Sequence, residues 1–124
     1  MFLENIQSEI ANDCLFIFLG GEPLLAWNSW LIPTIERLHN LNSNYQFRLS
    51  TNGVLLTSNK YSDIDKYQIN INLSFDGPKE VHNLNRKLLS GAGSFDIVYN
   101  NFLKIPDSLS MLLHPSSTIH INTV

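Results

Sequence analysis

Glycines and polar residues that could bind a ligand follow three segments of the chain that have the pattern of β-strands. Gly20-Gly21-Glu22-Pro23 follows the first segment, Thr51-Asn52-Gly53 the second and Asp76-Gly77-Pro78 the third. Glycine lets a backbone approach a ligand closely or adopt a positive φ. Because α/β barrels carry their binding site at the carboxyl ends of the strands, we expect these three turns to lie together.

The residue types in and near these turns suit a particular kind of ligand. The carbonyl groups beside Glu22 would accept hydrogen bonds from an ammonium group. Asn52 and Ser74 offer the neutral hydrogen bonds that a ribose hydroxyl needs. Arg86 could bind a carboxylate through two parallel hydrogen bonds. The set is therefore complementary to a nucleoside that bears an amino acid.

Each feature also has an ordinary structural explanation. Asn-Gly and Asp-Gly are common turn sequences, and Glu22-Pro23 suits the start of a helix. Taken alone, Arg86 would be a solvated surface residue, His82 a hydrogen-bonded structural histidine and Asp76 a residue that caps its turn. Their order and their shared position at strand ends favour the binding interpretation.

The elements that position these residues alternate between strands and helices. Strands are predicted at residues 15–19, 45–50, 67–75 and 118–122, with helices at about 28–41, 57–66 and 94–105 between them. Alternation of this kind predicts parallel βαβ units and an α/β fold. An antiparallel sheet that is wetted on one face is the alternative.

Three of the predicted strands alternate between apolar and polar residues. In the segment 67–75, Ile69, Ile71 and Leu73 face one way, while Asn70 and Asn72 face the other. A closed barrel of eight strands fills its interior with branched apolar side chains. Polar side chains on the inner face therefore predict a more open barrel with room for a ligand.

Composition narrows the classes of function. The chain has 124 residues, which suits one small domain, and its formal net charge of −3 argues against binding to nucleic acid. No apolar run is long enough to span a membrane and no signal peptide is visible. Cys14 is the single cysteine, so it forms no internal disulfide and cannot build a thiolate metal site. The expected compartment is the cytoplasm.

Five segments, in order, resemble the radical S-adenosylmethionine (SAM) superfamily. The similarity is to the branch of anaerobic sulfatase-maturating enzymes and peptide maturases with SPASM-type extensions. The matching segments read GGEP at 20–23, TNGVLL at 51–56, SFDGP at 74–78, HNLNR at 82–86 and GAGSF at 91–95. Asn83 stands where that branch usually has aspartate.

This resemblance implies a partial (β/α)6 barrel that comprises the whole chain, residues 1–124. It implies that the amino group of SAM lies against Gly20, Gly21, Glu22 and Pro23. It further implies that Ser74 and Arg86 contact the ribose and the carboxylate of SAM. By the same resemblance, Thr51 and Asn52 are also expected to bind SAM. In the family, a [4Fe-4S] cluster on three cysteines reduces SAM to a 5′-deoxyadenosyl radical, and the substrate is often a peptide or protein side chain.

The chain departs from the family pattern in one decisive way. The CxxxCxxC loop that holds the cluster precedes the GGEP segment in the family, and this sequence has only Cys14 there. No catalytic residue and no metal ligand is therefore predicted, and we expect a radical SAM fragment that is inactive alone, without the first and last barrel strands. The alternatives are a non-catalytic module that binds SAM, a nucleoside or a peptide, and one subunit of a split enzyme whose companion chain carries the cluster loop.

Overall fold

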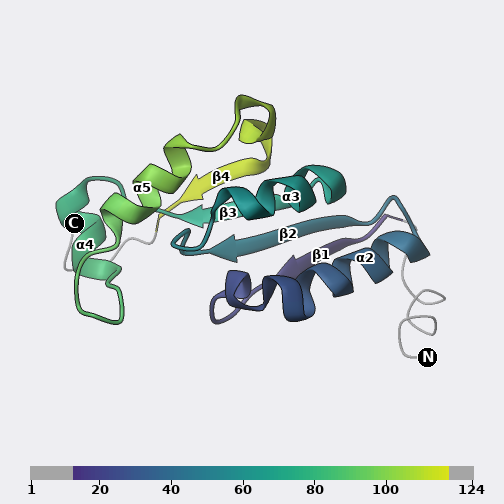
Figure 1. Ribbon diagram of the computed structural model, residues 1–124, viewed down its shortest axis with the longest axis horizontal. Helices are drawn as coiled ribbons and strands as arrows, with labels where there is room; N and C mark the ends of the chain where they lie inside the picture. The colour runs from purple at the N-terminus through teal and green to yellow at the C-terminus, as the bar shows by residue number, and fades with distance from the viewer. Residues whose placement is uncertain (1–12, 118–124) are drawn as a thin grey trace.

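The computed structural model describes residues 13–117, and its centre is one parallel sheet of four strands (Figure 1). The strands lie side by side in the order in which they occur in the sequence, and each neighbouring pair is parallel. They are β1 (Leu15–Phe18), β2 (Gln46–Thr51), β3 (Asn70–Ser74) and β4 (Leu113–Ser116). The α/β class with parallel strands is thus confirmed, and the antiparallel alternative is wrong.

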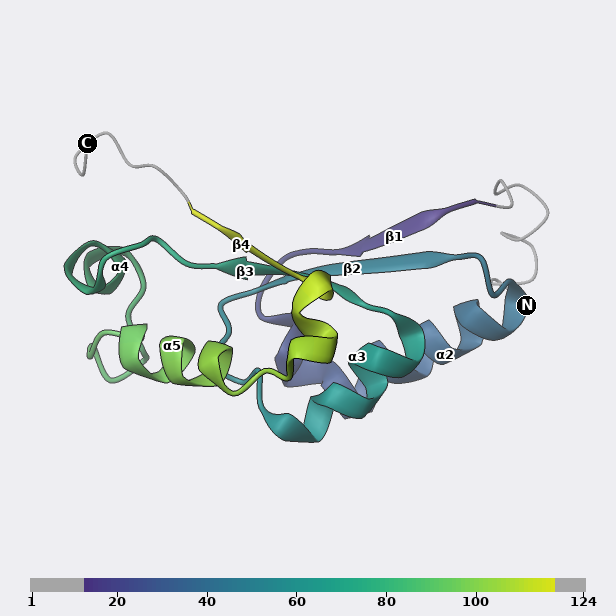
Figure 2. The same cartoon turned by 90° about the horizontal axis from the view of Figure 1, so that it is seen from above.

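Helices cover one face of this sheet. Figure 2 shows α2, α3 and α5 on the same side of the strands, while α4 lies beyond the carboxyl ends of the strands. The α-helices are α2 (Ile32–Leu41), α3 (Tyr61–Tyr67), α4 (Lys79–Asn85) and α5 (Phe95–Leu103). Shorter turns are η1 (Pro23–Ala26), the π-helical η2 (Trp27–Leu31), η3 (Ser58–Lys60) and η4 (Asp107–Leu112). The other face of the sheet carries no helix within residues 13–117.

The core lies between the sheet and these helices. Phe47 and Leu49 of β2 and Ile71 and Leu73 of β3 point into it and are at most 1% exposed. The residues that alternate with them lie on the uncovered face, and these are Arg48, Ser50, Asn70, Asn72 and Ser74. The predicted alternation of apolar and polar faces is confirmed for both strands.

The helix expected from Asn28 begins later. Residues 27–31 form the π-helical turn η2, and the α-helix begins at Ile32 with Pro33 in its first turn. Proline fits the first turn because it has no backbone N–H to donate, and for the same reason it cannot continue a regular helix from the preceding residues. The side-chain hydroxyl of Thr34 instead donates to the carbonyl of Trp30 over 2.7 Å.

The third strand is shorter than predicted. Tyr67 still belongs to α3, and Gln68 then adopts a left-handed conformation with φ of 49°. The Gln68 amide side chain donates to the backbone carbonyl of Asp65 over 2.7 Å, and the Ile69 N–H donates to the carbonyl of Ile64. These bonds close the end of the helix, so β3 begins at Asn70.

The predicted strand at 118–122 lies outside the described residues. The described fourth strand, β4, occupies Leu113–Ser116, where no strand was predicted. Leu113 pairs with Ile71, His114 with Asn72 and Ser116 with Ser74. A proline in the segment, Pro115, obscured the strand, although proline is tolerated at the edge of a sheet.

No helix among residues 13–117 is both long enough and apolar enough to cross a membrane.

Candidate functional site

The loop after β1 brings two glycines to the carboxyl end of the sheet. Gly20 has φ of +86° and Gly21 has φ of +53°, conformations that disfavour residues with a Cβ atom. A Cβ added at either position would meet no atom within 4 Å. The glycines are therefore required by the backbone conformation, and the space beside them is open.

Glu22 ties this loop to the end of β2. Its Oε1 accepts hydrogen bonds from the Leu24 N–H over 3.1 Å and the Thr51 hydroxyl over 2.5 Å, and its Oε2 accepts from the Asn52 N–H over 2.9 Å. Glu22 also caps η1, with Pro23 in the first turn. The structural explanation for Glu22-Pro23 as a helix start is thus confirmed, and the carboxylate holds two strand ends together.

Thr51 and Asn52 differ in what they can reach. Thr51 is 3% exposed, and besides donating to Glu22 its hydroxyl accepts from the Gly53 N–H over 3.1 Å. The Asn52 side chain is exposed, and its Oδ1 accepts from the Val54 N–H over 3.0 Å. Thr51 therefore supports Glu22 from behind, whereas Asn52 faces solvent.

α5 fixes the loop after β2 from the helix-covered side. The side-chain amide of Asn101 donates to the carbonyls of Gly53 and Val54, each over 2.9 Å. No sequence pattern indicated this contact, because 48 and 47 residues separate the partners. The loop that presents Asn52 is therefore positioned by an element that lies much later in the chain.

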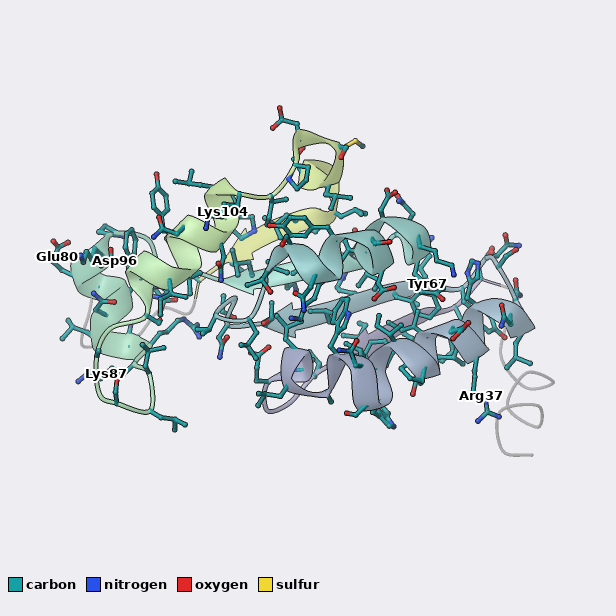
Figure 3. The ribbon with its side chains drawn as sticks, in the orientation of Figure 1. Arg37, Tyr67, Glu80, Lys87, Asp96 and Lys104 are labelled. Carbon is teal, nitrogen blue, oxygen red and sulfur yellow. The ribbon has the colours of Figure 1, made fainter. Side chains whose placement is uncertain are left out.

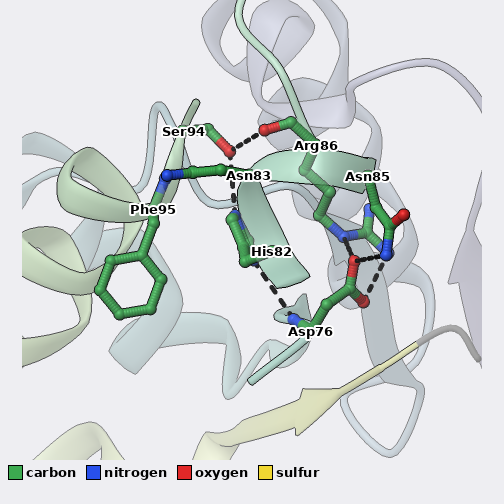
Figure 4. A network of polar contacts seen from close by, with 7 residues as sticks. All are labelled: Asp76, His82, Asn83, Asn85, Arg86, Ser94 and Phe95. Atoms are coloured by element: carbon green, nitrogen blue, oxygen red, sulfur yellow. Dashed lines mark hydrogen bonds and ion pairs between the residues drawn. The ribbon is translucent and has the colours of Figure 1, made fainter. Parts of the chain in front are cut away.

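Arg86 is bound to a carboxylate of the protein itself, as Figure 4 shows. Its Nε donates to Asp76 Oδ2 over 2.9 Å and its Nη2 to Asp76 Oδ1 over 3.4 Å. Asn85 Nδ2 also lies 3.4 Å from Asp76 Oδ2. The Asp76 side chain is 1% exposed and the Arg86 side chain 25%. Since a buried carboxylate needs a paired charge, Asp76 holds the guanidinium at the end of α4.

His82 lies behind this ion pair and is fully buried. Its Nδ1 accepts from the Asp76 N–H over 3.2 Å, and its Nε2 is 2.9 Å from the Ser94 hydroxyl, which donates to the Arg86 carbonyl over 2.8 Å. Burial lowers the pKa of His82, the charge of Asp76 raises it in part, and the charge of Arg86 lowers it further. The interpretation of His82 as a hydrogen-bonded structural histidine is confirmed.

Asn83 begins α5. Its side-chain Oδ1 accepts from the Phe95 N–H over 3.0 Å, which satisfies one of the open donors in the first turn of that helix. Ser94, at the N-cap position of α5, makes no capping bond with its side chain because its hydroxyl contacts His82 and Arg86 instead. The HNLNR segment thus connects α4 to α5.

A cleft of about 760 Å³ brings some of the predicted residues together. Glu22 and Asn52 line one part of it, and Arg86 and Lys87 line another. A smaller hollow of about 350 Å³ is lined by Gly20, Glu22 and Pro23 among others, so Glu22 borders both. Of the remaining predicted residues, Thr51 lies behind Glu22, and Ser74 lies on the uncovered face of the sheet, where it pairs with Ser116.

Sequence reasoning missed the partners that hold Arg86. It treated Asp76 as a turn residue and did not predict α4, although His82 and Arg86 are four residues apart and so share a face of a helix or its end. That spacing, directly after Asp76-Gly77-Pro78, was the available signal.

The residues of this chain do not fit an iron–sulfur cluster. Cys14 is the single thiol in the sequence and is partly buried just before β1. Within residues 13–117, no group of three or more His, Cys, Asp or Glu side chains is placed to hold a metal ion. A [4Fe-4S] cluster needs three or four thiolates, so its ligands do not come from this sequence.

Known proteins of similar sequence include an anaerobic sulfatase-maturating enzyme and a radical SAM cyclopropyl synthase. No family model matches the chain. A cysteine-type anaerobic sulfatase-maturating enzyme of Clostridium perfringens (strain 13 / Type A) is 35% identical over 99 residues, which cover 77% of this chain and 27% of that enzyme. The radical SAM cyclopropyl synthase TigE of Paramaledivibacter caminithermalis is 37% identical over 70 residues, covering 52% of this chain and 14% of the relative.

Solved structures agree with these relatives. A hexahistidine-tagged anSMEcpe with bound AdoMet superposes with a TM-score of 0.79 and 29% identity, over 98% of this chain and 34% of that one. A native anSMEcpe with bound AdoMet and Kp18Cys peptide gives a TM-score of 0.70 and 29% identity, over 94% of this chain and 32% of that one. The chain spans about a quarter to a third of the length of the sulfatase-maturating enzyme and of the two anSMEcpe structures. Sequence and structure together place this chain in the radical SAM superfamily, beside a segment of the anaerobic sulfatase-maturating enzymes.

Proposed function

We propose that this chain forms the SAM-binding wall of a radical SAM core that modifies a peptide or protein side chain. The observation that carries the proposal is the cleft of about 760 Å³, into which the ends of β1, β2 and α4 bring Glu22, Asn52 and Arg86. Acidic, neutral and basic groups around one cleft suit a ligand with an ammonium group, hydroxyls and a carboxylate. The whole chain, residues 1–124, serves as one part of that core domain.

Different residues bind different groups of the ligand. The backbone of Gly20, Gly21 and Pro23 and the carboxylate of Glu22 receive the amino group, in the open space that the glycines leave. Because Glu22 already accepts three hydrogen bonds from the protein, its charge is fixed in position before the ligand arrives.

The remaining contacts are neutral or cationic. Asn52 and Ser74 meet ribose hydroxyls, and Thr51 acts by holding Glu22. Arg86 is oriented by its two hydrogen bonds to Asp76 and lines the cleft, so a ligand carboxylate would meet the guanidinium from the cleft side.

Bound SAM supplies a sulfonium carbon–sulfur bond that a single electron can cleave. The electron source needs thiolates that this sequence does not provide, so we assign no catalytic residue and no metal ligand to it. In this proposal, those thiolates come from a further segment of the same polypeptide or from a companion chain. The proposed compartment is the cytoplasm. The proposed peptide substrate follows the peptide seen with the structural neighbour.

SAM binding to the chain, measured by titration calorimetry, tests the proposal. We expect saturable binding that Glu22→Ala and Arg86→Ala each weaken by about tenfold or more, as loss of a charge-assisted hydrogen bond predicts. Glu36→Ala and Arg37→Ala are matched controls, since both residues are exposed on α2 and Arg37 lies at the opposite end of the molecule from Lys87 of the cleft (Figure 3). A folded chain that does not bind SAM would overturn the proposal.

The single cysteine favours a second candidate, a SAM-binding module without chemistry. Measuring iron and sulfide in the protein, purified from its source in the absence of oxygen, distinguishes the two candidate functions. About four iron atoms for each chain, the content of one cluster, would support a component of a radical enzyme. SAM binding without iron would support the module.

A further inference from the structure

The two ring nitrogens of His82 have partners that fix where its proton is. The Asp76 backbone N–H can only donate, so the Nδ1 that accepts from it over 3.2 Å carries no proton. In the neutral ring the proton is then on Nε2, which donates to the Ser94 hydroxyl over 2.9 Å. The Ser94 hydroxyl donates its own proton to the Arg86 carbonyl over 2.8 Å, so each donor in this series has an acceptor.

This chain of hydrogen bonds joins the backbones of the two residues whose side chains form the ion pair. The ring holds the backbone of Asp76 directly and the backbone of Arg86 through Ser94, and the Arg86 N–H also donates to the His82 carbonyl over 2.8 Å. Figure 4 shows the ring between the two residues. One imidazole therefore links the backbones of both residues of the ion pair.

We propose that neutral His82, with its proton on Nε2, is the positioning residue that clamps Asp76 and Arg86 in the geometry that binds the carboxylate of the ligand. The proposal rests on the proposed function for its ligand, and it adds a condition: the clamp holds only while the ring is uncharged. A second proton would go on Nδ1 and face the Asp76 N–H, so two donors would meet where one bond now exists.

The surroundings of the ring determine the direction of the effect. The charged groups that act on it are Asp76 and Arg86, while Phe75, Phe95 and Ser94 are uncharged neighbours. Burial, the largest cause, lowers the pKa of His82 below its ordinary value. Because the folded state binds the proton more weakly than the unfolded state, the contribution of the clamp to stability is complete above about pH 6.5 and is lost as the pH falls below it.

Nitrogen-15 NMR of the full chain tests the clamp without any ligand. Long-range proton–nitrogen spectra distinguish a protonated from an unprotonated ring nitrogen. We expect His82 to carry its proton on Nε2 at neutral pH, and the Asp76 amide signal to shift together with the ring as the solution is acidified. A proton on Nδ1, or an Asp76 amide that ignores the titration of the ring, would overturn the proposal whether or not SAM binds.

The pH dependence of SAM affinity tests the link to the ligand. Between about pH 7 and pH 5.5, where the carboxyl group of SAM stays ionised and its amino group stays protonated, we expect wild-type affinity to fall by less than about tenfold, because the lowered pKa of His82 leaves part of the ring neutral at pH 5.5. His82→Asn keeps an oxygen that can accept from the Asp76 N–H but does not titrate, so it should bind within a few-fold of wild type and show no such fall. His39→Gln, on α2, is the matched control and should keep the wild-type profile.

The outcomes separate the two proposals. If SAM does not bind at any pH, the proposed function fails, and the NMR result alone decides the clamp. If wild type and His82→Asn bind SAM with the same pH profile, His82 is merely structural. Should His82→Asn not fold, Ser94→Ala takes its place, because it removes the link to the Arg86 carbonyl. Weaker binding by this folded variant supports the clamp, and unchanged binding contradicts it.

Discussion

The two faces of the four-stranded sheet are built on different principles. On the face under the helices, Phe47, Leu49 and Ile71 are at most 1% exposed and form part of one continuous core. On the opposite face, Arg48 and Asn70 alternate with them along the same strands and remain partly exposed. Burial of apolar area stabilises the first face, whereas the second contributes polar groups that no described helix covers. One strand therefore carries residues for stability and residues for recognition at alternate positions.

The largest difference between the faces is expected at neighbouring positions of β2. Phe47→Ala should lower the free energy of unfolding by about 3–5 kcal/mol, because the side chain is fully buried and leaves a cavity. Arg48→Ala should cost less than about 1 kcal/mol, since the buried Nε of Arg48 has no hydrogen-bond partner to lose. Urea denaturation of both variants measures the contrast. Equal losses would mean that the polar face is also part of the stabilising core.

The helix-covered side extends beyond the strands to Gly53. A Cβ at this position would clash with Leu73 Cδ1 and lie 3.0 Å from Val98 Cγ1, and φ is +81°. Gly53→Ala should destabilise the chain by about 2–4 kcal/mol, from overpacking and from the left-handed backbone together.

Gly91→Ala separates the two causes of this loss. Gly91 has φ of +90° but would place its Cβ in open space, so the cost should be only the conformational one, about 1–2 kcal/mol. Thermal unfolding of both variants gives the difference. If Gly91→Ala proved as costly as Gly53→Ala, crowding against Leu73 and Val98 would not matter.

The smallest effect is expected on the uncovered face at Asn70. His114 Nε2 donates to Asn70 Oδ1 over 3.2 Å, in a position open to solvent. Asn70→Ala should change the free energy of unfolding by no more than about 0.5–1 kcal/mol, because water replaces the lost partner. Its neighbour Ile71, on the core side, provides the comparison, and Ile71→Ala should cost about 2–5 kcal/mol. A large effect of Asn70→Ala in chemical denaturation would contradict the distinction between the faces.

Local pattern was enough to predict these two faces. Alternation in β2 and β3 identified the buried and the polar residues, because side chains of a strand point to opposite sides in turn. The exact start of β3 was not predictable in this way. It depends on the left-handed conformation of Gln68 and on the hydrogen bond from the Ile69 N–H to the Ile64 carbonyl. Both features end the helix at a point where the alternation of apolar and polar residues continues without a break.

The candidate site was predictable only in part. Turn sequences predicted the strand ends, and the resemblance identified Glu22, Asn52 and Arg86, which line one cleft. Sequence reasoning did not foresee that Arg86 would be paired with Asp76, since it did not predict α4, the helix that brings Arg86 back to the loop after β3. The bonds from Asn101 to the loop after β2, by contrast, join residues 47 and 48 positions apart and leave no periodic signal in a single sequence.

The order of the strands has a consequence for how the chain acquires its structure. Within residues 13–117, each strand pairs only with the strands that precede and follow it in the sequence, so each pairing in the sheet β1-β2-β3-β4 closes only the stretch of chain between consecutive strands. Pairing of this kind costs less chain entropy than pairing between strands further apart in the sequence would, although each parallel pair still needs a crossover connection. A sheet of this order can lengthen on the ribosome one strand and helix at a time, and the strand that has just emerged always finds its partner already in place.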